Sequence, residues 1–284
     1  MRRAMPSPIL FGDRLRSAMQ AYGPLCVGID PHPALLEAWG LENTAEGVRS
    51  FSLTVVEAMA GAAAILKPQV ALYERFGSAG FAALEETLAA AKAAGLLTLA
   101  DAKRGDIGST MAAYATAWLD DESPLASDAV TLSPYLGYES LRPALDLAAA
   151  TGRGVFVLGL TSNPEGPSVQ HVGGENSVAK SIIDQVTREN AAAVDLGHVG
   201  LVVGATIGDA PQKLGIDLSA SKAPLLTPGL GAQGATAKDI AKSFASSYSQ
   251  VLGTSSRDIL KVGPNVAALR EKARSVRDEL IAAG

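Results

Sequence analysis

Short apolar runs recur along the chain, and stretches with helical character separate each run from the next. Runs of this kind, bounded by glycine, proline and small polar residues, are typical of strands that are buried on both faces of a parallel sheet. The pattern predicts eight such strands. They are expected at residues 25–30, 63–67, 97–100, 129–133, 154–160, 199–205, 224–227 and 248–252, the last being the weakest.

Predicted helices lie between these runs and at both ends of the chain. A helix over 11–22 precedes the first strand. The next is expected to start at Asn43, which has Glu46 three positions later, and to run towards Gly61. The remaining helices are expected at about 80–95, 109–119, 139–152, 177–193, 211–214, 235–244 and 265–283.

The alternation of strands and helices predicts a (β/α)₈ TIM barrel, formed as a single domain by residues 1–284. The helix over 11–22 is expected to close the bottom of this barrel, and the helix over 265–283 is expected to end the chain. An open doubly wound sheet is disfavoured, because no Gly-x-Gly-x-x-Gly follows the first strand.

Composition and charge restrict the class of protein. The 284 residues are 48% hydrophobic, which is enough for a large core in one barrel or in two smaller domains. The net charge of -5, with no basic block, argues against nucleic acid as a partner. No apolar stretch approaches the roughly 18 residues of a membrane span, and the apolar run near the first residue is too short for a signal peptide. We therefore expect a soluble cytoplasmic protein without a membrane partner.

The cysteine and the histidines offer little chemistry. Cys26 lies in an apolar run, which indicates a packed core thiol, and a single cysteine is typical of a reducing compartment. His32, His171 and His198 are scattered without the spacing of metal ligands. The sequence therefore predicts no metal site.

The chemically richest stretch covers residues 97–110. Side chains alternate along a strand, so Asp101 and Lys103 share one face at the carboxyl end of the third run, where each favours the charged form of the other. The alternative is an exposed ion pair worth about 0 to 1 kcal/mol. The preceding run is too apolar for a surface, which favours an active site. Asp106 follows Gly105 beyond the strand, so it need not join the other two from the same chain.

Two other predicted strands end in charged residues. Asp30 ends the first, and Lys67, followed by Pro68, ends the second. Lys67 is equally compatible with a functional role and with a side chain that reaches from a strand end to solvent. The loop over 161–176 is long and rich in glycine and proline, so it is either a lid or disordered.

The turn over 228–234, Pro-Gly-Leu-Gly-Ala-Gln-Gly, leads from the seventh strand into a helix. Its free N–H groups and the helix N-terminus can face an anion, and barrels commonly bind phosphate after strands seven and eight. Arg257, after the eighth strand, would add a bidentate guanidinium. The alternative is an ordinary glycine turn, but its pairing with Arg257 favours a phosphate site.

These motifs together resemble one family. Residues 101–110, Asp-Ala-Lys-Arg-Gly-Asp-Ile-Gly-Ser-Thr, are similar to the Asp-x-Lys-x-x-Asp signature of orotidine 5'-phosphate decarboxylases, which related sugar-phosphate lyases and synthases share. The segments that begin at Leu25, Lys67, Thr161 and Thr227 resemble the longer bacterial (type 2) form. The resemblance implies a homodimer that converts orotidine 5'-phosphate to uridine 5'-phosphate, the last step of de novo pyrimidine biosynthesis, without a cofactor.

The resemblance also implies roles for individual residues. Lys67, Asp101, Lys103 and Asp106 would form the catalytic array, in which Lys103 protonates a C6 carbanion. The other implied contacts are Asp30 with the ribose, Ser162 with the pyrimidine, Gln233, Gly234 and Arg257 with the phosphate, and Asp106 and Thr110 with the site of the neighbouring subunit.

Two other functions stay open at this stage. One is a Mg²⁺-dependent sugar-phosphate decarboxylase or synthase, which needs further carboxylates around the metal where this chain has Lys67. The other is a non-catalytic nucleotide-binding barrel that keeps the phosphate loop. The four intact charged positions argue against the second function.

Overall fold

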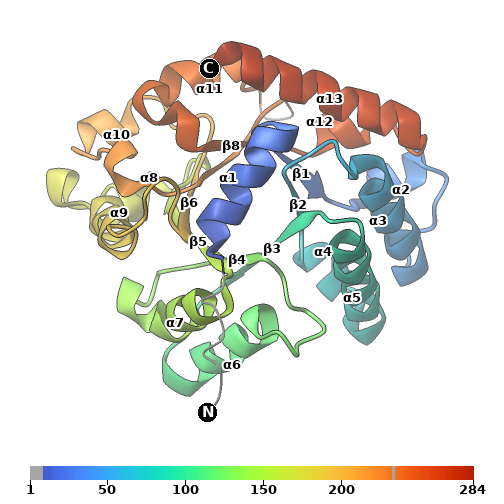
Figure 1. Cartoon of the computed structure of the whole chain (residues 1–284), viewed down its shortest axis with the longest axis horizontal. Helices are drawn as coiled ribbons and strands as arrows, with labels where there is room; N and C mark the ends of the chain where they lie inside the picture. The colour runs from blue at the N-terminus through green and yellow to red at the C-terminus, as the bar shows by residue number, and fades with distance from the viewer. Residues whose placement is uncertain (1–8, 232–233) are drawn as a thin grey trace.

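A computed structural model describes residues 9–231 and 234–284 of the chain. Within them, eight parallel strands close into a barrel in which each strand pairs with its neighbours in sequence, and β1 pairs with β8 (Figure 1). The (β/α)₈ barrel predicted from the sequence is therefore confirmed. The strands are β1 (Leu25–Ile29), β2 (Ile65–Pro68), β3 (Leu97–Arg104), β4 (Ala129–Leu132), β5 (Gly154–Leu160), β6 (Val199–Val203), β7 (Leu225–Pro228) and β8 (Val251–Ser255).

Most of the helices surround this ring of strands, as Figure 1 shows. The α-helices are α1 (Phe11–Tyr22), α2 (Pro33–Ala38), α3 (Ala45–Met59), α4 (Ala71–Glu74), α5 (Gly77–Ala93), α6 (Gly108–Leu119), α7 (Arg142–Thr151), α8 (Pro167–Gln170), α9 (Val178–Glu189), α10 (Ala210–Lys213), α11 (Ala237–Ser243), α12 (Arg257–Leu260) and α13 (Val266–Ala283). Short 3₁₀ helices are η1 (Tyr138–Leu141), η2 (Gly174–Asn176), η3 (Ser219–Ser221) and η4 (Ala245–Gln250).

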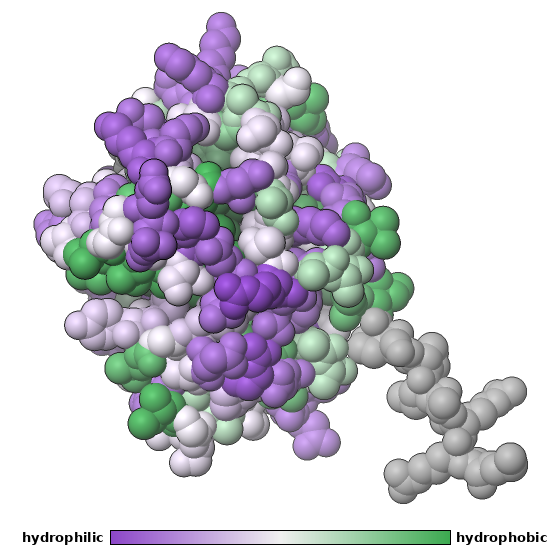
Figure 2. Space-filling model, turned by 90° about the vertical axis from the view of Figure 1, so that its left-hand side faces the viewer, coloured by the Kyte–Doolittle hydropathy of each residue, from purple (hydrophilic) through white to green (hydrophobic). Residues whose placement is uncertain are grey.

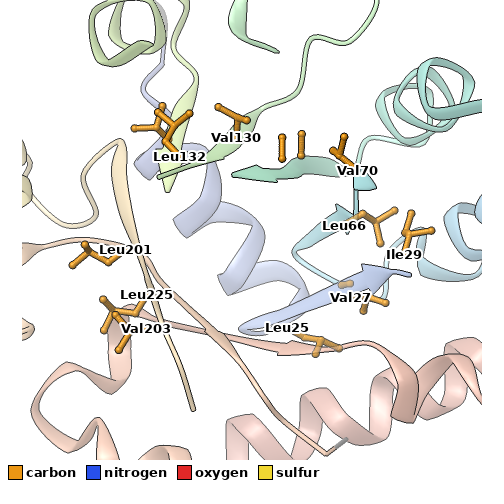
Figure 3. Packing of buried hydrophobic residues seen from close by; sticks show 14 of the residues in the cluster. Leu25, Val27, Ile29, Leu66, Val70, Val130, Leu132, Leu201, Val203 and Leu225 are labelled. Carbon is orange, nitrogen blue, oxygen red and sulfur yellow. The ribbon is translucent and has the colours of Figure 1, made fainter. Parts of the chain in front are cut away.

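Alternating side chains on the strands build two separate layers of core. On β1, Leu25, Val27 and Ile29 belong to the layer between strands and surrounding helices, part of which is seen in Figure 3. Cys26, between two of them, belongs to the layer that fills the barrel interior. Burial raises the pKa of this thiol to about 12. Cys26 is therefore a packed core residue, as the sequence predicted.

Helix α1 contributes to the inner layer and crosses the middle of the strand ring in Figure 1. Its buried residues Phe11, Leu15 and Met19 share one apolar cluster with inward-facing strand residues. The Phe11 ring meets the Phe156 ring of β5 edge-on, with 5.9 Å between centroids. A side chain at Gly154 would collide with Phe11, since an added Cβ would lie 2.3 Å from the ring. The residue at 154 must therefore be glycine for α1 to approach this closely.

Some element boundaries differ from those predicted. Helix α3 is capped by Thr44, whose hydroxyl accepts a hydrogen bond from the Gly47 N–H, and not by Asn43. The last strand is at 251–255 rather than 248–252, because residues 245–250 form η4. There Tyr248 reaches outward and donates a hydrogen bond to the Leu280 carbonyl of α13. Strand β3 extends to Arg104, beyond the apolar run that predicted it.

The surface is mixed in character. On the face that Figure 2 presents, polar side chains predominate and apolar ones form small separate groups. Within the described ranges, no helix is both long and apolar enough to cross a membrane. The same residues contain no group of three or more His, Cys, Asp or Glu side chains placed to hold a metal ion.

Candidate active site

A cavity of about 330 Å³ opens at the carboxyl ends of the strands. This is the end of a TIM barrel where loops and strand ends build active sites. One wall is charged and the floor is apolar, formed by Leu158, Val202 and Leu226 from the inner side of the barrel. The other lining residues are Asp30, Lys67, Gln69, Asp101, Lys103, Thr161, Ser162, Asn163, Gly204, Pro228, Gly229, Leu230, Thr254, Ser256 and Arg257.

The Asp101 carboxylate lies between two lysine amines on the charged wall. Its Oδ2 accepts a hydrogen bond from Lys67 Nζ at 3.0 Å, and its Oδ1 accepts one from Lys103 Nζ at 2.6 Å. Lys67 and Asp101 are buried, whereas the Lys103 side chain is 46% exposed. The alternation expected for β3 is thus observed, with Leu99 inside the barrel and the two charged residues above it.

The mutual charges fix the protonation states of this array. Burial by itself would raise the pKa of Asp101, but the charges of Lys67 and Lys103 and their hydrogen bonds outweigh it and hold the pKa well below 3.8. Burial by itself would lower the pKa of Lys67, but the charges of Asp101 and Asp30 outweigh it and raise the pKa above 10.5. At neutral pH the carboxylate is therefore ionised and Lys67 is protonated.

The backbone of β3 is irregular where it carries these residues. Ala100 of β3 pairs with Val130 of β4, and the next pair along the ladder is Arg104 with Leu132. Strand β3 therefore has more residues between these two pairs than β4 has. Lys103 has φ +47°, the left-handed region that side chains other than glycine rarely adopt. Such conformations persist where the surrounding structure determines them, and they cluster at active sites.

Two further polar residues support Asp101. Gln69 donates a hydrogen bond from Nε2 to the Asp101 carbonyl, at 3.3 Å. The Thr131 hydroxyl of β4 donates to Asp101 Oδ1 at 2.9 Å and accepts from the Lys103 backbone N–H at 2.9 Å. Neither residue was predicted from the sequence, although a lone polar residue inside the apolar β4 run is a signal that could have indicated Thr131.

Asp30 presents a buried carboxylate oxygen to the same cavity. Its Oδ1 has no hydrogen-bond partner within residues 9–231 and 234–284, and the nearby Ser256 Oγ has none there either. Gly28 keeps this corner open, because an added Cβ would lie 2.8 Å from Ser256 Cβ and 3.1 Å from Asp30 Oδ1. Buried polar groups without partners usually meet water or a ligand. This corner suits a ligand with hydroxyl groups.

The first residues of the glycine turn after β7 also line the cavity. Gly229 and Gly231 have φ of +124° and +76°, so the turn needs glycine at both positions. Arg257 begins α12, lines the cavity and is exposed. Gly229 and Arg257 thus line the same cavity, and their joint role in binding phosphate stays a prediction.

The amino-acid sequence from residue 23 to 272 matches the model of the orotidine 5'-phosphate decarboxylase / HUMPS family. The chain belongs to this family. It is 55% identical to the orotidine 5'-phosphate decarboxylase of Salinispora arenicola over 268 residues, covering 94% of this chain and 95% of the relative.

Solved structures of the decarboxylase family superpose over nearly the whole chain. A crystal structure assigned to the orotidine 5'-phosphate decarboxylase of Streptomyces avermitilis has 51% identity and a TM-score of 0.93, covering 100% of this chain and 99% of that one. The OMP decarboxylase of Leishmania donovani has 30% identity and a TM-score of 0.77, covering 97% and 99%.

The structure brings together most, but not all, of the residues that resemblance to this decarboxylase family singled out. Six of them line the cavity: Asp30, Lys67, Asp101, Lys103, Ser162 and Arg257. Three described residues, Asp106, Thr110 and Gly234, do not. Gln233 lies outside the described residues.

Asp106 lies in the loop between β3 and α6, and Thr110 lies in α6. The Asp106 carboxylate accepts a hydrogen bond from the Ile107 N–H, and Thr110 is exposed in the first turn of α6. Large apolar side chains are exposed nearby: Ile107 is 62% exposed and Tyr135, in the loop after β4, is 80% exposed. The two loops are neighbours, because an added Cβ on Gly105 would lie 2.4 Å from the Ser133 carbonyl oxygen.

The segment over 161–176 contains α8 and η2. Gln170 accepts from the Thr161 N–H at 2.9 Å and donates to the Thr161 hydroxyl at 2.7 Å, which ties the end of α8 to the start of the loop. Thr161, Ser162 and Asn163 line the cavity, so the start of this loop forms part of its wall. Its movement as a lid stays a prediction.

Proposed function

We propose that this chain decarboxylates orotidine 5'-phosphate to uridine 5'-phosphate. The observation that carries the proposal is the array in which one buried, ionised carboxylate lies between two lysine amines at the mouth of the barrel. The cavity also offers the contacts that a nucleotide needs, namely an apolar floor, an unpartnered carboxylate oxygen and an arginine beside a glycine turn. Family membership supports the same reaction.

The reaction leaves an electron pair on C6 of the pyrimidine that the ring does not delocalise well. The C6–carboxylate bond breaks, CO₂ departs, and C6 takes a proton from Lys103 Nζ. Fixed charges in a water-poor site stabilise such developing charge better than water does. Asp101 would face the substrate carboxylate, where two negative charges repel each other until CO₂ leaves. The repulsion would be offset by binding of the distant phosphate.

Each remaining residue has a supporting role in this proposal. Lys67, buried against Asp101, holds the carboxylate in place and keeps it ionised. Asp30 accepts hydrogen bonds from ribose hydroxyls, and Ser162 contacts the pyrimidine. The phosphate is bound by Arg257 and the glycine turn, with Gln233 and Gly234 as further proposed contacts. No cofactor takes part, and residence in the cytoplasm stays a prediction.

We extend the proposal to a homodimer with shared sites. Asp106 does not line the cavity of its own chain, and it precedes the exposed Ile107, in a loop that neighbours the one carrying the exposed Tyr135. A two-fold axis through this apolar area would bring Asp106 and Thr110 of each chain to the partner's cavity, since the same surface meets itself in such a dimer. Asp106 would then complete the partner's charged array and help to hold its Lys103.

Replacing Lys103 with alanine tests the chemistry. The variant should lose turnover, measured as the fall in orotidine 5'-phosphate absorbance without added metal, because the proton donor is gone. It should keep its affinity for uridine 5'-phosphate in calorimetric titration, because the phosphate, ribose and base contacts remain. Substantial residual turnover would contradict the assignment of Lys103. Loss of wild-type activity in a chelator would favour the Mg²⁺-dependent alternative, and binding without turnover in the wild type would favour a non-catalytic barrel.

Mixing two inactive variants tests the shared sites. Chains with Asp106→Ala and chains with Lys103→Ala should regain activity when they exchange subunits, because one site of each mixed dimer then has an intact Asp106 and an intact Lys103. Each variant alone serves as the control. Absence of recovery in dimers shown to be mixed would contradict the sharing of sites.

A further inference from the structure

Thr131 is a buried residue that does not line the cavity but binds two parts of its charged wall. It lies on β4 and is fully buried. Its Oγ1 lies 2.9 Å from the Lys103 backbone nitrogen and 2.9 Å from Asp101 Oδ1. A single hydroxyl therefore connects the backbone of the proposed proton donor with the carboxylate that holds its amine.

The chemistry of the partners fixes the direction of both hydrogen bonds. A backbone N–H can only donate, so the Thr131 hydroxyl accepts from Lys103. The lowered pKa of Asp101 makes it an ionised carboxylate, which can only accept, so the hydroxyl donates to Asp101. Valine or alanine at this position can do neither.

The hydroxyl replaces a contact that the irregular backbone cannot make. The ladder between β3 and β4 is broken between Ala100 and Arg104, and Lys103 lies inside this break with φ +47°. Its N–H is satisfied by the Thr131 side chain rather than by a regular strand partner. The Lys103 side chain is half exposed, so packing does little to hold it. The fixed points of Lys103 are therefore its backbone, held by Thr131, and its amine, held by Asp101.

We propose that Thr131 is a positioning residue, which sets the left-handed backbone of Lys103 and the orientation of the Asp101 carboxylate through its one hydroxyl. This inference rests on the proposed decarboxylation. It assigns Thr131 no contact with the substrate. Loss of the hydroxyl should therefore reduce the rate of the chemical step far more than it reduces nucleotide affinity.

Four side chains at position 131 separate the hydroxyl from the methyl group. Threonine and valine have nearly the same shape, but only threonine has a hydroxyl. Serine and alanine both lack the methyl group of threonine, and only serine has a hydroxyl. Thr131→Val and Thr131→Ala should each lose roughly 100-fold in kcat, the order expected for misplaced reacting groups. Thr131→Ser should retain most of the wild-type kcat. The dissociation constant for uridine 5'-phosphate should change little in all three variants.

Thr87→Val is the matched control for loss of a buried threonine hydroxyl. Thr87 is also fully buried, but it lies in α5 and its hydroxyl donates to the Ala83 carbonyl, away from the cavity. This variant should keep the wild-type kcat. If Thr131→Val does not fold, the comparison of serine with alanine gives the same answer.

Two results would overturn the inference while leaving the proposed function intact. One is an unchanged kcat in folded hydroxyl-free variants of an active enzyme. The other is a loss of nucleotide affinity in proportion to the loss of kcat, with no rescue by serine, which would indicate general damage. A wild-type protein that does not decarboxylate orotidine 5'-phosphate would instead refute the proposed function itself.

Discussion

Replacing Asp101 with asparagine removes a negative charge that lies next to a buried positive charge. Lys67 Nζ is 3.0 Å from Asp101 Oδ2, and the two side chains are only 6% and 9% exposed. Removal of one partner from a buried ion pair commonly costs about 3–5 kcal/mol, because the remaining charge is left without compensation. We therefore expect Asp101→Asn to lower the free energy of unfolding by an amount in this range at pH 7.

The ordinary pKa of lysine sets an upper limit for the charge part of this loss. In the variant, Lys67 can become neutral by losing its proton, so that no buried positive charge remains without the Asp101 carboxylate. At pH 7 this deprotonation costs about 5 kcal/mol, because the ordinary pKa of 10.5 lies well above that pH. At pH 9.5 the same deprotonation costs only about 1.4 kcal/mol. The difference in stability between wild type and variant should therefore shrink as the pH rises from 7 to 9.5.

The wild-type pair itself contributes no such dependence in this pH window. The pKa of Asp101 is lowered, so its contribution is complete above the unfolded value near 3.8 and is lost as the pH falls through the folded value. The pKa of Lys67 is raised, so its contribution is complete below 10.5 and is lost as the pH rises through the folded value. Between pH 7 and 9.5 the pair's contribution is constant, and the change comes from the variant.

Urea unfolding followed by circular dichroism, at one fixed protein concentration, measures these differences. Lys103→Ala is the matched control, because its amine binds the same carboxylate but its side chain is 46% exposed, and loss of exposed pairs costs about 0–1 kcal/mol. Lys67→Met combined with Asp101→Asn should recover most of the stability. A loss below about 1 kcal/mol at pH 7, or an equal loss at both pH values, would refute the reasoning.

Three further predictions concern the fold. Gly154→Ala should destabilise the protein by about 1–3 kcal/mol in urea unfolding, because the new Cβ collides with the Phe11 ring; an unchanged midpoint would contradict the close approach of α1. Thr44→Ala should cost about 1 kcal/mol as loss of a helix cap, and Asn43→Ala should cost less. Cys26 should react with a thiol reagent only on unfolding, because it is fully buried and burial raises its pKa to about 12.

The order of strands and helices could be predicted because local patterns carry it. A strand buried on both faces must be apolar, so the runs that became β1 and β5 are visible without knowledge of their neighbours. The shared face of Asp101 and Lys103 follows from alternation along one strand. These predictions depend only on residues that are close in sequence.

The features that could not be predicted depend on contacts between distant segments. Thr131 joins the site through its register with β3, and the break in that ladder is visible only once both strands are paired. The pattern of residues 248–252 predicts a strand. In the structure, however, the Tyr248 hydroxyl donates a hydrogen bond to a carbonyl of α13, and the chain before Val251 forms a 3₁₀ helix. Two adjacent polar residues, Asn43 and Thr44, could have capped α3. In the structure the Thr44 hydroxyl accepts the hydrogen bond from the first turn of the helix.

The left-handed backbone at Lys103 has a consequence for any effort to make this protein more resistant to heat. A lysine in that conformation costs about 1–2 kcal/mol, whereas glycine adopts it freely and loses about 0.5–1 kcal/mol in chain entropy. Lys103→Gly would relieve this strain but also remove the ion pair with Asp101, worth about 0–1 kcal/mol, so the chain would have about the same resistance to heat and no amine at this position. A screen for thermal resistance alone would retain such inactive chains, so turnover has to be selected at the same time.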